Sequence, residues 1–320
     1  MPDNPLTGLR LKWPLFLSVA VLGSFLTLLV SAEGRSTPVK AFVSIPPQAF
    51  FVEQIGGDHV MIDTLLMPGK NHDTFTPSPD QVARLAKADL FFTIGLPYER
   101  SVVKKIETGF KNLRVVNTVE GISFRKIEGG HTHAHDHDHE DSSPLSDRED
   151  GSVGNDPHTW LNPLLVITQA ENILTALIAA DPENRSFYTA NFEAFTGKLK
   201  ELDGMIRSLL EPVKGGVIFV FHPAYGYFTD AYGLKQMPVE IEGKSPKVKE
   251  LASFIKQAKE HHVRALFVQK DSSHVAAKKI AAAVNGVVIE VNPLEKNYFG
   301  NLMAIAEAVS GALKKEPGEE

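Results

Sequence analysis

Short apolar runs rich in β-branched and aromatic residues alternate along the chain with longer stretches that have helical spacing. This alternation is typical of parallel sheets whose strands are connected by crossover helices. Four such runs lie in the first half of the chain and four in the second, so the pattern predicts an α/β fold with two lobes, each a mostly parallel sheet flanked by helices. The eight predicted strands cover residues 39–44, 60–66, 89–94, 113–116, 217–221, 236–241, 265–269 and 287–291.

The clearest helix start in the first half lies at Ser78. Ser78 can cap the helix, Pro79 suits its first position, and Gln81 completes a capping box. In the second half, one helix is predicted to begin at Ser245-Pro246 and another to lie near 273–284.

A longer helix is predicted between the two halves. Asp181-Pro182 supplies a cap and a first-turn proline, and no proline interrupts residues 183–210. At 1.5 Å per residue this helix would reach roughly 42 Å, and a helical linker is stiff. We therefore expect lobes at 33–180 and 213–320, joined by one long rigid helix at 181–212.

The sequence pattern of residues 1–32 predicts an export signal. Arg10 and Lys12 precede an 18-residue apolar run that ends at Val30, and small residues follow up to Ala32. A membrane anchor is the alternative, because a run of this length is at the lower limit for spanning a bilayer. No cluster of Lys and Arg follows the run, which favours cleavage after Ala32 and a periplasmic location.

The composition restricts the chemistry of any site. Against 33 Lys and Arg stand 39 Asp and Glu, and the 320 residues contain no long basic run interleaved with aromatic residues, so nucleic acid is not an expected partner. The chain has no cysteine, which excludes disulfides, thiolate metal sites and cysteine nucleophiles. Any metal must be bound by His, Asp, Glu or Asn.

The composition of residues 128–155 predicts a disordered His-rich loop, because these residues are polar and carry little apolar surface to bury. Five of the 12 histidines fall within nine residues here, alternating with Thr, Ala and Asp. Imidazoles and carboxylates at this density offer many exchangeable sites, so we expect an auxiliary metal-collecting loop. An incidental polar insertion is the alternative. The five histidines are His131, His133, His135, His137 and His139.

Three further histidines lie on proline-bounded loops. His72 lies in the 68–73 loop, His158 in the 156–163 segment, and His222 at the end of the 217–221 strand. Ligands of open α/β sheets bind at the carboxyl ends of strands, so these three are candidate metal ligands. Asn292 follows the last predicted strand in the same way. An ordinary surface or core role is expected for the other histidines outside the loop, which are His59, His261, His262 and His274.

Several sequence stretches together resemble a known family. They are Ser44-Ile45-Pro46-Pro47 and the blocks 68–79, 156–161, 221–227 and 292–298. With them the chain resembles the zinc-binding periplasmic component of ABC metal importers, in the solute-binding family that takes up zinc and manganese. The resemblance covers essentially all of the mature chain. It implies two α/β lobes joined by a long helix, a metal bound between them, and delivery of that metal to a membrane permease.

The resemblance also assigns residues to metal positions. His72 and His158 match the first and second positions, in the first lobe, and His222 matches the third, where manganese-binding members tend to have a carboxylate. Three imidazoles suit zinc better, and the acidic His-rich loop is likewise a feature of zinc-binding members. At the fourth position Asn292 replaces the usual Asp. We expect three histidines and a water as ligands of Zn²⁺, with Asn292 or Glu295 as alternative fourth ligands.

Three histidines and a water also describe a catalytic zinc site, so a zinc-dependent hydrolase is an alternative. Hydrolysis needs a general base such as the Glu of a His-Glu-x-x-His helix, and the chain lacks that pattern. A metal-storage protein or an adhesin is a second alternative. We predict a monomeric, non-enzymatic protein that captures Zn²⁺ and delivers it to a membrane permease.

Overall fold

The computed structural model describes residues 37–314, apart from 68–69, 73, 111, 129–153, 241–247, 262 and 270–273. The predicted signal segment and the five histidines of the His-rich loop therefore lie outside the described residues. The predicted helix start at Ser245-Pro246 lies outside them as well.

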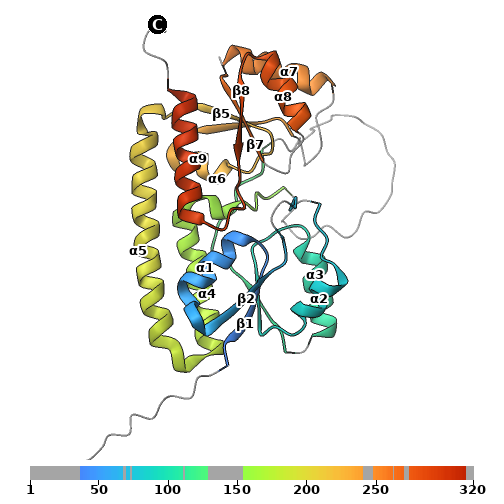
Figure 1. The fold of residues 1–320 in the computed structure, drawn as a ribbon, viewed down its shortest axis with the longest axis vertical. Helices are drawn as coiled ribbons and strands as arrows, with labels where there is room; N and C mark the ends of the chain where they lie inside the picture. Colours follow the sequence, from blue (N-terminus) through green and yellow to red (C-terminus); the bar gives the residue numbers. More distant parts are fainter. Residues whose placement is uncertain are drawn as a thin grey trace, which may run out of the picture. The chain divides into compact units, whose positions relative to one another are not determined.

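A four-stranded parallel sheet organises the first half of the chain (Figure 1). Its strand order is β2-β1-β3-β4, so the two interior strands β1 and β3 pair in register from Ala41 with Leu90. β1 and β3 are mostly buried, as interior parallel strands are. The strands are β1 (Val39–Val43), β2 (Val60–Thr64), β3 (Leu90–Thr93) and β4 (Arg114–Asn117), and the helices are α1 (Pro46–Gly56), α2 (Pro79–Leu85), α3 (Glu99–Gly109) and α4 (Pro163–Ala180).

A second parallel sheet of four strands, in the order β6-β5-β7-β8, repeats the arrangement of the first. All eight predicted strands are present, and the prediction of two similar α/β units is confirmed. The strands are β5 (Val217–Val220), β6 (Lys235–Pro238), β7 (Ala265–Gln269) and β8 (Val287–Val291), and the helices are α6 (Gly226–Tyr232), α7 (Val248–Glu260), α8 (His274–Ala283) and α9 (Tyr298–Leu313).

Side-chain caps define two helix starts in the first half. The amide of Gln81 donates to Ser78 Oγ at 3.2 Å while the amide of Ser78 donates to Gln81 Oε1 at 2.9 Å, so the predicted capping box is confirmed. Asn162 caps α4 by accepting from the amide of Leu164 at 2.9 Å. Each cap supplies an acceptor to an N–H that has no partner within its helix.

The long helix α5 spans Arg185–Leu210, and its 26 residues extend about 39 Å. The predicted cap at Asp181 is wrong in detail. A short 3-10 turn, Pro182–Asn184, precedes the α-helix, and the Asp181 carboxylate accepts from the side chains of Asn184 and Tyr188, both at 2.7 Å. Two side-chain donors therefore compete successfully with the backbone amides for this carboxylate.

α5 joins the two halves through packing as well as through the chain. It lies beside α4, α1 and α9, as Figure 1 shows for α5 and α9. Phe51 of α1, Phe195 of α5 and Tyr298 of α9 meet in one buried cluster, with ring centroids 6.0 Å apart for Phe51 and Phe195 and 4.9 Å for Phe51 and Tyr298. One core is thus continuous across both halves, and the lobe boundaries at 180/181 and 212/213 remain predictions.

Among the described residues, α4 is the one helix that is long and apolar enough to cross a membrane. Its residues Val166, Ile173 and Leu177 are buried, and it packs along α5 and α1. These contacts make α4 a core helix of the first half.

Candidate functional site

The three loop histidines lie together, as predicted. His72 belongs to the segment after β2, His158 directly precedes the turn Thr159–Leu161, and His222 follows β5. Each offers a ring nitrogen, and these nitrogens all lie within 4.8 Å of one another. The Nε2 atoms of His72 and His158 are 2.9 Å apart. Loops at the carboxyl ends of both sheets thus converge on one point.

The spacing of these nitrogens suits a small divalent ion. A tetrahedral zinc with Zn–N bonds of about 2.0–2.1 Å places its nitrogen ligands roughly 3.3 Å apart. The nitrogen separations, from 2.9 Å to the 4.8 Å limit, bracket that value. A change of no more than about 1.5 Å in any of these separations would therefore give a three-imidazole site.

Burial controls the charge of the cluster. His72 and His158 are fully buried and His222 is 3% exposed. Burial, reinforced by the neighbouring rings of His158 and His222, holds the pKa of His72 well below its usual value of 6.5. His72 is therefore neutral at pH 7, and the neutral imidazole is the form that binds a metal.

Two carboxylates lie behind the cluster. His158 Nδ1 is 2.7 Å from Asp156 Oδ1, and His222 Nδ1 is 3.0 Å from Glu240 Oε2. An ionised carboxylate only accepts hydrogen bonds, so each ring carries its proton on Nδ1 and presents the lone pair of Nε2 to the site. This arrangement orients both rings for metal binding.

The roles of Asp156 and Glu240 were not predicted from the sequence. Asp156 had a local signal, because it stands two residues before His158 in the same motif, whereas Glu240 is 18 residues from His222. Burial favours a higher pKa for Asp156, but the electrostatic interaction with His158 and the hydrogen bonds from His158 and Arg125 outweigh it and hold the pKa below its usual value of 3.8. Asp156 is therefore ionised.

Trp160 connects the histidines to the turn that carries Asn292. Its ring centroid lies 5.1 Å from that of His158 and 6.4 Å from that of His72. Its Nε1 donates to the carbonyl of Pro293 at 2.8 Å. Asn292 itself uses Oδ1 to accept from the amide of Leu294 at 3.0 Å, and its Nδ2 donates to Glu295 Oε2 at 3.3 Å. Its role at the fourth position remains a prediction.

The histidines predicted to have no metal role lie elsewhere where they can be placed. The His59 ring packs against Phe187 with centroids 4.7 Å apart, and His261 is exposed just after α7. His274 begins α8, and His262 lies outside the described residues.

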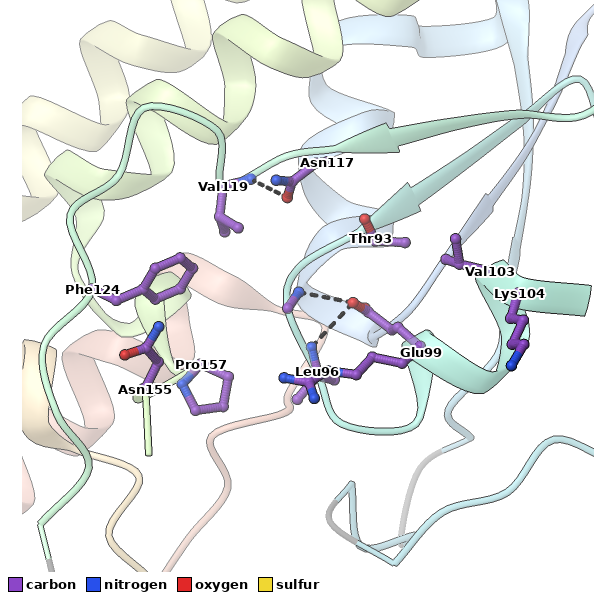
Figure 2. A pocket seen from close by; sticks show the side chains of 12 residues that line it. Thr93, Leu96, Glu99, Val103, Lys104, Asn117, Val119, Phe124, Asn155 and Pro157 are labelled. Carbon is purple, nitrogen blue, oxygen red and sulfur yellow. Dashed lines mark hydrogen bonds between the residues drawn. The ribbon is translucent and has the colours of Figure 1, made fainter. Parts of the chain in front are cut away.

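A separate hollow of about 520 Å³ opens at the carboxyl ends of β3 and β4 (Figure 2). Within the described part of the chain its lining includes Phe124, Asn155 and Pro157 but not the three histidines. Glu99 forms part of its wall and accepts from the amides of Gly95 at 2.8 Å and Leu96 at 3.0 Å. The hollow is therefore distinct from the histidine cluster.

The protein has two α/β units joined by a long helix, and loops of these units form a buried cluster of three histidines. This combination defines a metal-binding protein of the solute-binding class. The family described as zinc-uptake complex component A, periplasmic, matches residues 42–312, and the chain belongs to this family.

Individual relatives agree with this assignment. The high-affinity zinc uptake system protein ZnuA of Bacillus subtilis (strain 168) is 28% identical over 293 residues, which cover 90% of this chain and 88% of that protein. A crystal structure of ZnuA is 32% identical with a TM-score of 0.77, covering 87% of this chain and 100% of that one. A zinc-bound deletion mutant of ZnuA has the same identity and TM-score and covers 88% of this chain and 100% of its own.

Family membership confirms the predicted function class. The chain is a zinc-binding component of an ABC zinc uptake system, and its family is one of solute-binding proteins rather than enzymes. Such a component acts outside the cytoplasmic membrane and has a permease as its partner. The hydrolase alternative is therefore set aside.

Proposed function

We propose that this protein captures Zn²⁺ with His72, His158 and His222 and delivers it to the permease of its importer. The observation that carries the proposal is the convergence of the three buried rings, with their nitrogens within 4.8 Å of one another. Neutral imidazoles are good ligands for borderline-soft zinc, whereas manganese prefers oxygen ligands. The ligand set therefore favours zinc as cargo.

A water molecule is proposed as the fourth ligand. The Asn292 side chain is neutral, and its oxygen already accepts a hydrogen bond from the amide of Leu294. A weak ligand engaged in a turn competes poorly with water for zinc. Asn292 would then support the water by a hydrogen bond, since its turn is tied to Trp160 beside the histidines.

Capture and release follow from where the ligands originate. His72 and His158 come from loops of the first sheet, and His222 comes from a loop of the second. Zinc bound to all three would link the two halves and stabilise the native state by mass action. Separation of His222 from the other two histidines would leave a two-ligand site and allow the ion to pass to the permease.

Three further proposals concern the protein outside this cluster. The signal segment is cleaved after Ala32, the mature protein acts in the periplasm as a monomer, and His131, His133, His135, His137 and His139 collect zinc. The cleavage, the location and the role of the loop rest on the sequence patterns of residues 1–32 and 128–155.

Competition between the protein and a chromophoric chelator for zinc tests the proposed site. Structural zinc sites with four ligands bind with about 10–16 kcal/mol, so losing one ligand should weaken binding by roughly 100-fold or more. We expect this loss for His222→Ala, and wild-type affinity for the control His261→Ala, whose side chain is exposed. Equal affinity of His222→Ala and wild type would refute the site.

A further inference from the structure

Arg125 contacts carboxylates from both halves of the protein. It lies on the segment after β4 and is mostly buried. Its Nη1 donates to Asp156 Oδ2 at 3.0 Å and its Nη2 to Glu128 Oε1 at 2.6 Å, both within the first half. Its Nε donates to Asp230 Oδ2 at 2.9 Å, and Asp230 belongs to α6 of the second half. One guanidinium thus links the two halves.

The carboxylate shared by Arg125 is the one that orients a proposed zinc ligand. Asp156 uses Oδ2 for Arg125 and Oδ1 for the ring of His158. Asp156 is fully buried, so an ionised oxygen left unpaired there would be costly. Arg125 therefore fixes Asp156, and through Asp156 it fixes the orientation of His158.

Tyr227 of α6 supports the same connection through the backbone. Its hydroxyl accepts from the amide of Arg125 at 3.1 Å and donates to the carbonyl of Asp156 at 3.1 Å. α6 begins at Gly226, four residues after His222, so the element that supports Arg125 is the one that follows the third proposed ligand.

Gly226 makes room for this contact. A Cβ built at Gly226 would overlap the Arg125 guanidinium and lie 2.8 Å from Asp156 Oδ2. The backbone of Gly226 does not itself require glycine, because its φ is not positive. The close approach of Arg125 and Asp156 explains its presence at the start of α6.

We propose that Arg125 is a positioning residue that couples the approach of α6 to the orientation of His158. The inference rests on the proposed zinc site. While Arg125 holds both Asp230 and Asp156, the Nε2 of His158 is directed at the ion. When α6 moves away, Arg125 loses Asp230 and Tyr227, Asp156 loosens, and His158 becomes a weaker ligand. When the two halves separate, zinc therefore loses His222 of the second half and is bound more weakly by His158 of the first half at the same time.

Zinc binding to full-length variants tests this coupling, with affinity measured by chelator competition and dissociation by stopped flow. Removing a partner that orients a ligating histidine weakens metal binding about 10–100-fold. We expect that loss, mainly as faster dissociation, for Arg125→Gln and also for Gly226→Ala, which changes no charge. The controls are Arg84→Gln, at an exposed ion pair with Asp63, and Gly204→Ala, where a methyl meets open space. Both should bind zinc like wild type.

A double-mutant comparison separates positioning from general destabilisation. If Arg125 acts through Asp156, Arg125→Gln should change zinc affinity less than about twofold in an Asp156→Asn background. If the two substitutions weaken zinc affinity independently, so that the double variant shows the product of the two single losses, the proposal is overturned. The visible spectrum of the Co²⁺-loaded protein gives a second readout, because it reports the ligand field and should change in Arg125→Gln but not in Arg84→Gln.

Asp230→Asn keeps the proposal testable if Gly226→Ala does not fold. The Asp230 side chain is 59% exposed, so its ion pair is weak and its loss should speed zinc dissociation only a few-fold. Wild-type dissociation in both Arg125→Gln and Asp230→Asn would refute the coupling while leaving the zinc site intact. Wild-type affinity in His222→Ala would refute the site itself, so the two failures are distinguishable.

Discussion

His158 Nδ1 lies 2.7 Å from Asp156 Oδ1, and both side chains are fully buried. A carboxylate in this position makes the imidazole a better electron donor and fixes its tautomer. The geometry of the proposed zinc site therefore depends also on residues that are not proposed ligands, and their substitution should change zinc affinity.

Asp156→Asn should weaken zinc binding about 10–100-fold, because an amide cannot supply the negative charge that supports His158. Chelator competition at constant pH measures the change. Asp63→Asn, at an exposed carboxylate paired with Arg84, is the matched control and should bind like wild type. An Asp156→Asn affinity within twofold of wild type would contradict the orienting role.

Glu240→Gln should weaken zinc binding less than Asp156→Asn does. The hydrogen bond to His222 is longer, at 3.0 Å, and the Glu240 side chain retains 15% exposure, so water can partly replace the carboxylate. We expect about a tenfold loss of affinity. A loss larger than that of Asp156→Asn would show that the His222 side dominates the site.

Asn292 distinguishes a water-completed site from direct ligation. Asn292→Ala should weaken zinc by no more than about 10–100-fold, since it removes only a hydrogen bond to the proposed water. Asn292→Asp should tighten zinc, because an anionic oxygen replaces a neutral one near a divalent cation. If Asn292→Ala loses as much affinity as His222→Ala, the amide is itself a ligand.

The stability of the zinc-free protein should depend on the ionisation of Glu99. Burial raises the pKa of Glu99 to about 7 from a reference of 4.5, against hydrogen bonds from Ser44 and from the amides of residues 94–96. Between these values the native state holds a proton that the unfolded chain has released. The stabilisation is complete below pH 4.5 and is lost as pH rises to 7, by on the order of 3 kcal/mol.

Denaturant unfolding across pH 4.5–7 measures this effect as a difference between wild type and Glu99→Gln. The difference is needed because His72, whose native pKa is lowered, contributes the opposite trend, with stability rising with pH up to about 6.5. Glu183→Gln, at an exposed carboxylate, should keep the wild-type profile. Parallel profiles for wild type and Glu99→Gln would contradict the prediction.

Local patterns predicted most of the fold. The run 265–269 is buried throughout and apolar up to Gln269, as interior parallel strands are, and the Ser78 cap is encoded within four residues. His72, His158 and His222 could be selected because each lies on a segment bounded by proline, and His72 and His222 also follow strands. The sheet topology then brings the carboxyl ends of strands together without any long-range signal being needed.

Contacts between distant segments were not predictable in this way. Glu240 reaches His222, and Arg125 reaches Asp230, only because the two sheets and α6 are already in place. The Asp181 cap failed for a related reason, since a tyrosine hydroxyl from the next turns of α5 competes for its carboxylate. Which hydrogen-bond partner such a side chain takes depends on tertiary packing, and no periodic pattern in the sequence indicates it.

Anomalous diffraction at the zinc absorption edge, from crystals of the zinc-loaded protein, locates the bound ion. We expect a strong peak about 2.0–2.1 Å from one ring nitrogen of each of His72, His158 and His222. A strongest peak bound by fewer than these three histidines, or located elsewhere in the protein, would contradict the proposed zinc site.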